Sequence, residues 1–204
     1  MNTIPEAIQA LDEAVLHWAQ GALGQSGALD FLLRVVGQWL VYLVPIALLL
    51  AWFYLRYGSG LKNWPAWRAD LILFTAAGML GWQVLSRIVK LFYFRERPSV
   101  AGENVKELFF HRPDESFPSD HAALFFGFAT YAYLRGWKST GHLMTGIALA
   151  VSLARIVTGT HWLTDILGGL VIGVASAYLI YLPGRWLRAH VAEPLERFLA
   201  RLGL

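Results

Sequence analysis

The sequence predicts an all-α polytopic membrane protein, a helical bundle of five or six transmembrane helices with interfacial amphipathic helices at both ends of the chain. Two observations predict this class. Hydrophobic residues make up 56% of the 204 residues and charged residues only 15%, which is far too apolar for an ordinary soluble domain. Residues 35–55 also carry no charged side chain, and a bilayer core requires about 20 such residues in a run.

A single integral membrane domain is expected over residues 1–204, in three parts. Residues 1–27 lack the basic flank and apolar core of a signal peptide. Their apolar side chains recur at helical spacing, which is typical of a helix lying on the membrane surface. Residues 28–183 form the predicted transmembrane core. Residues 184–204 have a basic and an apolar face, which indicates an amphipathic helix on the anionic cytoplasmic leaflet.

After residues 35–55, the remaining predicted spans reach full length only if they include flanking polar residues: 71–86, 122–134, 143–154 and 166–183. Their orientation follows from Lys and Arg, which are retained on the cytoplasmic side. One set of connections is rich in them: Arg56, Lys62, Arg68, Arg135, Lys138, Arg185, Arg188, Arg197 and Arg201. The other set holds the acidic N-terminus and a loop with balanced charges. The N-terminus is therefore predicted outside and the C-terminus inside.

A first cluster of ionisable residues lies at the outer end of the second span. Lys90 and Arg97 are separated by six residues, and Pro98 follows directly. Read alone, the two cations could simply anchor the span at the interface. The planar fork of an arginine and the compact charge of a lysine could instead hold a phosphoryl group together.

The second cluster is SFPSDHA, residues 116–122, which directly precedes a long apolar run. Ser119 and Asp120 are typical of a helix start, so one interpretation is a capped helix whose His121 faces water. A helix N-terminus is also an anion site, where Ser119 and free amides could cradle a phosphate and His121 could donate a proton. Asp120 is included among the phosphate-site candidates, although it could also pair with an arginine or cap the helix.

The third cluster places Arg155 six residues before His161, and Asp165 four residues after it. Positions four apart share a face of a helix, so Asp165 could accept a hydrogen bond from one ring nitrogen of His161. The other nitrogen would then be available as a nucleophile. A structural histidine paired with an acid is the alternative.

These clusters, Lys-x6-Arg-Pro, Pro-Ser-x-His and Arg-x5-His-x3-Asp, in this order resemble the type 2 phosphatidic acid phosphatase superfamily, over roughly residues 35–183. The resemblance implies a phosphatase that needs no metal and no cofactor. In it, His161 attacks phosphorus and forms a phosphohistidine, Asp165 orients it, and His121 protonates the leaving oxygen. It assigns the binding of phosphate oxygens to Lys90, Arg97, Ser119 and Arg155.

The string from Phe110 to Ala122, with its Pro-Ser-Asp-His form, resembles bacterial undecaprenyl-diphosphate phosphatases of the bacitracin-resistance type. This subgroup implies hydrolysis of undecaprenyl diphosphate at the outer face of the bacterial cell membrane, which recycles the carrier lipid for cell-wall synthesis. Two positions depart from the usual family pattern. Asp120 stands where glycine is common, and Ala154 stands where serine is usual, which removes a hydrogen bond but no charge.

Other interpretations remain open at this point. The lipid could be phosphatidic acid, phosphatidylglycerol phosphate or lipid A, or the protein could be a non-catalytic carrier that binds lipid headgroups. A membrane lipid is the expected partner, without nucleic acid, and the oligomeric state is left open. A soluble vanadate haloperoxidase relative does not fit the apolar spans. Arg87 could join the site or merely face lipid headgroups. Five residues of the outer loop could select the diphosphate or simply be solvated: Glu103, His111, Arg112, Asp114 and Glu115.

Overall fold

The computed structural model describes residues 4–101, 105–108 and 115–204, and it contains helices but no strand among these residues. The elements follow in this order: α1 (Glu6–Gln20), α2 (Gly27–Arg34), η1 (Val35–Trp39), α3 (Leu40–Phe53), η2 (Tyr54–Gly58), α4 (Trp64–Met79), η3 (Leu80–Leu85), α5 (Ser86–Phe92), α6 (Pro98–Ala101), α7 (Asp120–Leu134), α8 (Lys138–Val157), α9 (Leu163–Tyr181), α10 (Gly184–Leu187), η4 (Arg188–Ala192) and α11 (Glu193–Arg201). The η elements are π-helical segments within longer helices.

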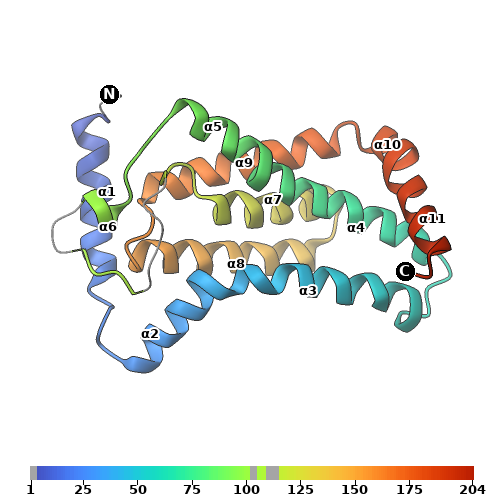
Figure 1. The fold of residues 1–204 in the computed structure, drawn as a ribbon, viewed down its shortest axis with the longest axis horizontal. Helices are drawn as coiled ribbons and strands as arrows, with labels where there is room; N and C mark the ends of the chain where they lie inside the picture. Colours follow the sequence, from blue (N-terminus) through green and yellow to red (C-terminus); the bar gives the residue numbers. More distant parts are fainter. Residues whose placement is uncertain (1–3, 102–104, 109–114) are drawn as a thin grey trace.

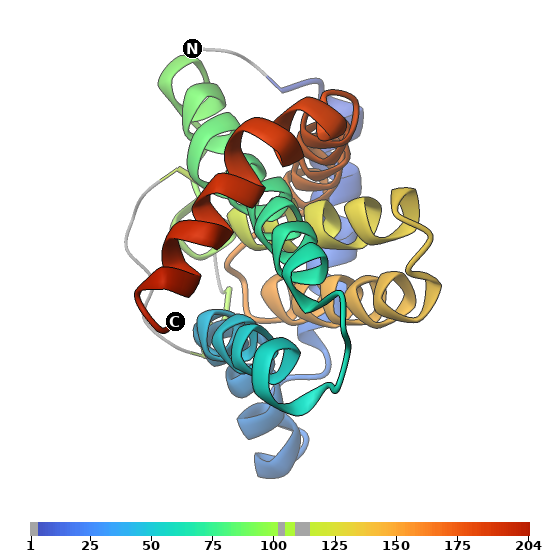
Figure 2. The ribbon, with the colours of Figure 1, turned by 90° about the vertical axis from the view of Figure 1, so that its right-hand side faces the viewer.

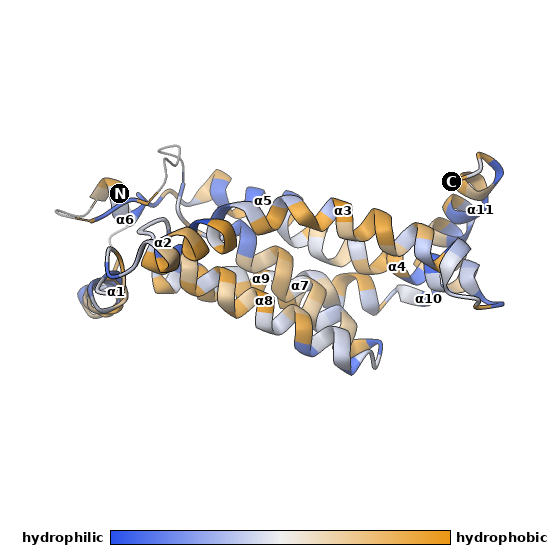
Figure 3. Ribbon diagram, turned by 90° about the horizontal axis from the view of Figure 1, so that it is seen from below, coloured by the Kyte–Doolittle hydropathy of each residue, from blue (hydrophilic) through white to orange (hydrophobic). Residues whose placement is uncertain are grey.

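The long helices run side by side, while α1 crosses one end of the bundle and α10 and α11 cross the other (Figure 1). Viewed along the bundle, the C-terminal helical segment passes diagonally over the helix ends (Figure 2). Hydrophobic residues dominate the middle of the bundle and hydrophilic residues gather towards its two ends (Figure 3). This banded distribution is what a membrane-spanning bundle requires.

Within the described ranges, four helical stretches are long and apolar enough to cross a membrane: Gly27–Gly58, Trp64–Phe92, Lys138–Val157 and Leu163–Tyr181. They correspond to four of the five predicted spans. The remaining predicted span, 122–134, lies in α7, whose 15 residues cover about 22 Å. That is shorter than a bilayer core of about 30 Å. The number of five or six transmembrane helices therefore stays a prediction.

Helix α7 lies in the interior, where it packs against α4, α8 and α9. Its contact with α9 depends on glycines. A Cβ atom added to Gly169 would lie 2.5 Å from the carbonyl oxygen of Ser119, and one added to Gly173 would lie 2.7 Å from that of Ala123. Small residues allow helix backbones to approach this closely. As a result the N-termini of α7 and α9 meet, and the Ser119 N–H donates to the Asp165 carbonyl at 3.0 Å.

Three of the basic residues predicted to lie in the cytoplasm form ion pairs at the end of the bundle crossed by α11. Asp70 accepts hydrogen bonds from Arg135 at 2.9 Å and from Arg188 at 2.7 Å. Arg68 is fully buried, lies 3.5 Å from Glu196 of α11 and stacks 3.4 Å above the Trp52 ring. Paired charges of this kind offset the cost of removing them from water.

The packing of α7 on α9 yields a stability prediction. Gly173→Ala should destabilise the protein by about 1 to 3 kcal/mol, because the new methyl group meets backbone atoms that cannot rotate away. Gly146→Ala in α8 is the matched control, since a Cβ there meets nothing within 4 Å and alanine favours a helix. Thermal unfolding in detergent measures both. Equal midpoints for the two variants would contradict the packing argument.

Candidate active site

A tight turn between α8 and α9 holds Arg155 and His161 together. Gly159 adopts a φ of 70° in this turn, a conformation that favours glycine. The Arg155 carbonyl oxygen then accepts hydrogen bonds from the Thr160 N–H at 3.0 Å, the Thr160 hydroxyl at 2.8 Å and the His161 N–H at 3.2 Å. The arginine and the histidine of the third cluster are thus fixed by one backbone turn.

His161 precedes α9, so the expectation that His161 and Asp165 share a helix face is wrong, although their contact forms. Asp165 lies in the first turn of α9 and accepts the Trp162 N–H at 2.8 Å. Its Oδ2 lies 3.4 Å from Nδ1 of His161. The histidine is therefore oriented by an acid that also caps the helix start.

The other nitrogen of His161 faces two arginines. Nε2 lies 3.3 Å from Nη1 of Arg97 and 3.4 Å from Nη2 of Arg155. A guanidinium group carries only donors, so Nε2 must present its lone pair. We infer that the ring proton lies on Nδ1, towards Asp165. The ring is 2% exposed, and its Nε2 atom points at two positive charges.

Backbone carbonyl groups fix both guanidinium groups in place. Arg97 donates to the carbonyl oxygen of Thr160 at 2.7 Å and to that of Glu115 at 3.3 Å. Arg155 donates at 3.1 Å to the carbonyl oxygen of Gly37, which lies in the π-helical segment η1. Segments of this kind interrupt the α-helical hydrogen-bond ladder and are frequent at functional sites. The first long helix thereby supports an arginine that lies 118 residues further along the chain.

The second cluster forms as a helix start, with a different pairing from the one expected. Ser119 is the N-cap of α7, and its hydroxyl accepts the Ala122 N–H at 3.4 Å. Asp120 does not cap the helix, and among the described residues it pairs with no arginine. It lies 2.7 Å from the ammonium group of Lys90, at the end of α5. His121, partly buried, follows on the first turn of α7.

Sequence reasoning missed a buried polar network behind His161. Arg95 donates to Oδ1 of Asp165 at 3.0 Å and to Oδ2 of Asp12 at 2.6 Å. The Ser116 hydroxyl donates to Oδ2 of Asp165. Arg95 was overlooked because it lies among the six unspecified residues between Lys90 and Arg97, and the motif specifies only the two ends of that stretch.

Asp12 was missed because α1 was interpreted by its apolar stripe. That stripe faces outward, with Leu11 50% and Trp18 77% exposed, while the buried face consists of Asp12, Leu16 and Ala19. These three positions recur at helical spacing, and the first of them on the inward face is an acid. An acid four residues before Leu16, in a segment otherwise suited to a surface helix, was the available signal.

The other residues singled out in the sequence lie partly within and partly outside the residues that the structure describes. Arg87 is exposed on α5, Ala154 is buried in α8, and Glu115 contributes its carbonyl group to Arg97. Glu103, His111, Arg112 and Asp114 lie outside the described residues. Among the residues that are described, no group of three or more histidine or acidic side chains is arranged to hold a metal ion.

Residues 69–188 match the model of the PAP2 superfamily, and they make up more than half of the chain. The chain belongs to the PAP2 superfamily. The resemblance inferred from the spaced motifs is thereby confirmed. The matched PAP2 region contains every candidate site residue but excludes α1, and with it Asp12, as well as the η1 segment that supports Arg155.

Individual members of the PAP2 superfamily resemble the chain to different extents. The bacitracin transport permease protein BcrC of Bacillus licheniformis is 32% identical over 111 residues, which is 54% of either chain, so the match spans about half of each. The undecaprenyl-diphosphatase BcrC of Bacillus subtilis is 26% identical over 161 residues, 79% of this chain and 78% of that protein. The crystal structure of Aquifex aeolicus LpxE shares the fold, with a TM-score of 0.62 and 24% identity over 83% of this chain and 93% of that one.

The pairing of Arg95 yields a second stability prediction. Arg95→Gln should destabilise the protein by roughly 3 to 5 kcal/mol, because it leaves two buried carboxylates without their shared cation. Arg87→Gln is the matched control, since Arg87 is exposed on the neighbouring helix. Thermal unfolding in detergent compares the two. A loss for Arg95→Gln no larger than that for Arg87→Gln would argue against a buried charge network.

Proposed function

We propose that this chain is an integral membrane phosphatase that hydrolyses undecaprenyl diphosphate to undecaprenyl phosphate and inorganic phosphate. One observation carries the proposal: His161 has Asp165 at one ring nitrogen and the guanidinium groups of Arg97 and Arg155 at the other. A neutral nucleophile that points into a positively charged pocket is suited to attack a phosphoryl group. Headgroup binding alone would not require an oriented histidine.

The proposed reaction has two steps. Nε2 of His161 attacks the terminal phosphorus, and the bond from phosphorus to the bridging oxygen breaks as His121 gives that oxygen its proton. Arg97 and Arg155 neutralise the charge on the phosphoryl oxygens, which is the main requirement of phosphoryl transfer. The positive charge that develops on the His161 ring is stabilised by Asp165. Water then cleaves the phosphohistidine, so the proposed mechanism uses no metal or cofactor.

Lys90, Ser119 and Asp120 complete the proposed phosphate site. Ser119 lies at the N-terminus of α7, where free backbone N–H groups and the helix dipole favour an anion. Lys90 forms an ion pair with Asp120 at 2.7 Å, and this contact holds the lysine at the same helix start. In the proposal, Lys90 contributes positive charge to the second phosphate group of a diphosphate while Asp120 fixes its position.

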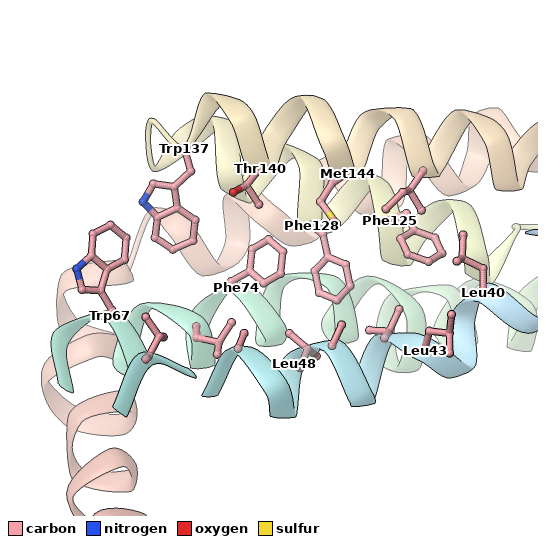
Figure 4. Close-up of a pocket in the computed structure, with 16 residues that line it drawn as sticks. Leu40, Leu43, Leu48, Trp67, Phe74, Phe125, Phe128, Trp137, Thr140 and Met144 are labelled. Carbon is pink, nitrogen blue, oxygen red and sulfur yellow. The ribbon is translucent and has the colours of Figure 1, made fainter. Parts of the chain in front are cut away.

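An apolar cavity of about 560 Å³ supports a substrate with a long hydrocarbon tail (Figure 4). It lies between α3, α4, α7 and α8, and none of the residues that line it carries a charge. Leu40 at one end follows Gly37 by about one helical turn, and Phe125 follows His121 by about one turn. A lipid whose phosphate lies at His161 could extend its tail into this cavity.

The choice of undecaprenyl diphosphate draws on the Pro-Ser-Asp-His form around Asp120 and on the similarity to the two BcrC proteins. Phosphatidic acid, phosphatidylglycerol phosphate and lipid A are the competing substrates within the same chemistry. The proposed location is a bacterial cell membrane, with the active site and N-terminus outside, the C-terminus in the cytoplasm, and α1 and α11 lying at the two interfaces. The basic end of the bundle around Arg135 and Arg188 supports this orientation.

Purified protein tested on a panel of lipid phosphates should release phosphate fastest from undecaprenyl diphosphate, with EDTA present. His161→Ala and Arg155→Ala should each lower kcat by roughly 1,000-fold or more, because they remove the nucleophile and a charge-neutralising group. His142→Ala serves as the control, since His142 is exposed near the opposite end of α8.

A separate result would contradict each part of the proposal: the metal-free reaction, the nucleophile, the substrate and catalysis itself. Loss of activity on chelation would rule out the metal-free reaction. Full activity of His161→Ala would show that His161 is not the nucleophile. Faster hydrolysis of phosphatidylglycerol phosphate or phosphatidic acid would contradict undecaprenyl diphosphate as the preferred substrate. Lipid binding without any phosphate release, unaffected by His161→Ala, would favour a carrier.

Filling the apolar cavity should impair binding of long-tailed substrates only. Val44→Trp should raise KM for undecaprenyl diphosphate about tenfold, which corresponds to about 1.4 kcal/mol, and leave KM for a short-tailed isoprenoid diphosphate unchanged. Leu50→Trp is the matched control on the same helix, because Leu50 is 67% exposed and does not line the cavity. Equal effects of Val44→Trp on both substrates would show that the tail lies elsewhere.

A further inference from the structure

The first helix contributes a carboxylate to the candidate active site from outside the region that matches the PAP2 superfamily. Asp12 of α1 is completely buried. Its two oxygens accept three hydrogen bonds: from Arg95 at 2.6 Å, from the Thr164 N–H at 2.9 Å and from the Thr164 hydroxyl at 2.6 Å. Thr164 and Arg95 both lie directly beside Asp165. An acid from the helix that crosses the end of the bundle therefore lies next to the residues that contact the proposed nucleophile, His161.

The contacts form a chain of alternating charges. His161 faces Asp165, Asp165 accepts from Arg95, and Arg95 also donates to Asp12. Arg95 is only 7% exposed, and both carboxylates are fully buried. One guanidinium group therefore serves two carboxylates, and the cluster retains a net negative charge where water cannot screen it.

We propose that Asp12 is a positioning residue of this site that acts through Arg95. The hydrogen bonds of Asp12 hold the Arg95 guanidinium group and the start of α9 beside Asp165. Arg95 in turn donates to Asp165 and favours its charged form, and that charge stabilises the positive His161 ring as the phosphorus bond forms. This inference rests on the proposed function, because it assigns Asp12 to the same reaction.

The contact between Asp12 and Arg95 can be tested with a double variant. Asp12→Asn retains the shape of the side chain but removes the charge that holds Arg95 in place. We expect kcat to fall about tenfold, in the range found for the outer partners of metal-bound histidines, with KM unchanged because Asp12 does not touch the phosphate site. Because Asp12 acts through Arg95, its replacement should have little further effect once Arg95 is replaced as well. The double variant Asp12→Asn/Arg95→Gln should therefore have the kcat of Arg95→Gln.

If Asp12 acted independently of Arg95, the two losses would multiply, and the double variant would be about tenfold slower than Arg95→Gln. Glu13→Gln is the matched control, since Glu13 is the neighbouring acid on α1 but is exposed. Thermal unfolding of every variant verifies that the compared proteins are folded. Unchanged kcat in Asp12→Asn, or losses that multiply in the double variant, would overturn the inference.

A second measurement does not depend on enzymatic activity. In protein labelled with 15N-histidine, the ring signals of His161 are identified by their loss in His161→Gln. Asp12→Asn should shift the Nδ1 signal, because the hydrogen bond to Asp165 changes, whereas Glu13→Gln should leave it in place. A wild type without phosphatase activity would contradict the proposed function. Identical His161 signals in wild type and Asp12→Asn would contradict this inference alone.

Discussion

The Asp165 carboxylate is the point at which separate parts of the chain are joined. It accepts hydrogen bonds from Arg95, Ser116 and the Trp162 N–H, and it faces His161. Each donor comes from a different segment, so the position of His161 depends on the α5–α6 connection, on the loop before α7 and on the start of α9. A buried carboxylate is tolerated only when it is paired and hydrogen-bonded, and that requirement fixes these segments relative to one another.

The tight packing of α7 on α9 brings these groups within reach. Gly169 and Gly173 allow the two backbones to touch, which places the α7 N-cap against the first turn of α9. Two helix N-termini therefore converge on one region, and both favour an anion there. The chemistry of the site and the packing of the bundle consequently depend on the same small residues.

Much of this arrangement could be predicted from the sequence, because membrane spans and spaced motifs leave strong patterns. The apolar run at 35–55 indicated the membrane class, and the three spaced clusters taken together indicated the family. Pairing between distant residues leaves no such pattern. Nothing in the sequence links Asp12 to Arg95 or the Gly37 carbonyl to Arg155, since each contact depends on tertiary packing across many residues. The local geometry of His161 was also misjudged, because a helix start brings residues four apart together in a different way from a helix interior.

The support of Arg155 by a backbone carbonyl of the first long helix has a consequence for where this molecule can be divided. The family match begins at residue 69, after both Gly37 and Asp12. A shortened protein that retained only the matched region would keep every side chain of the spaced motifs, but Arg95 would lose the Asp12 carboxylate and Arg155 would lose the Gly37 carbonyl group. The boundary of the family match is therefore not the boundary of the structural unit that holds the candidate site in place, because that unit includes α1 and the first long helix.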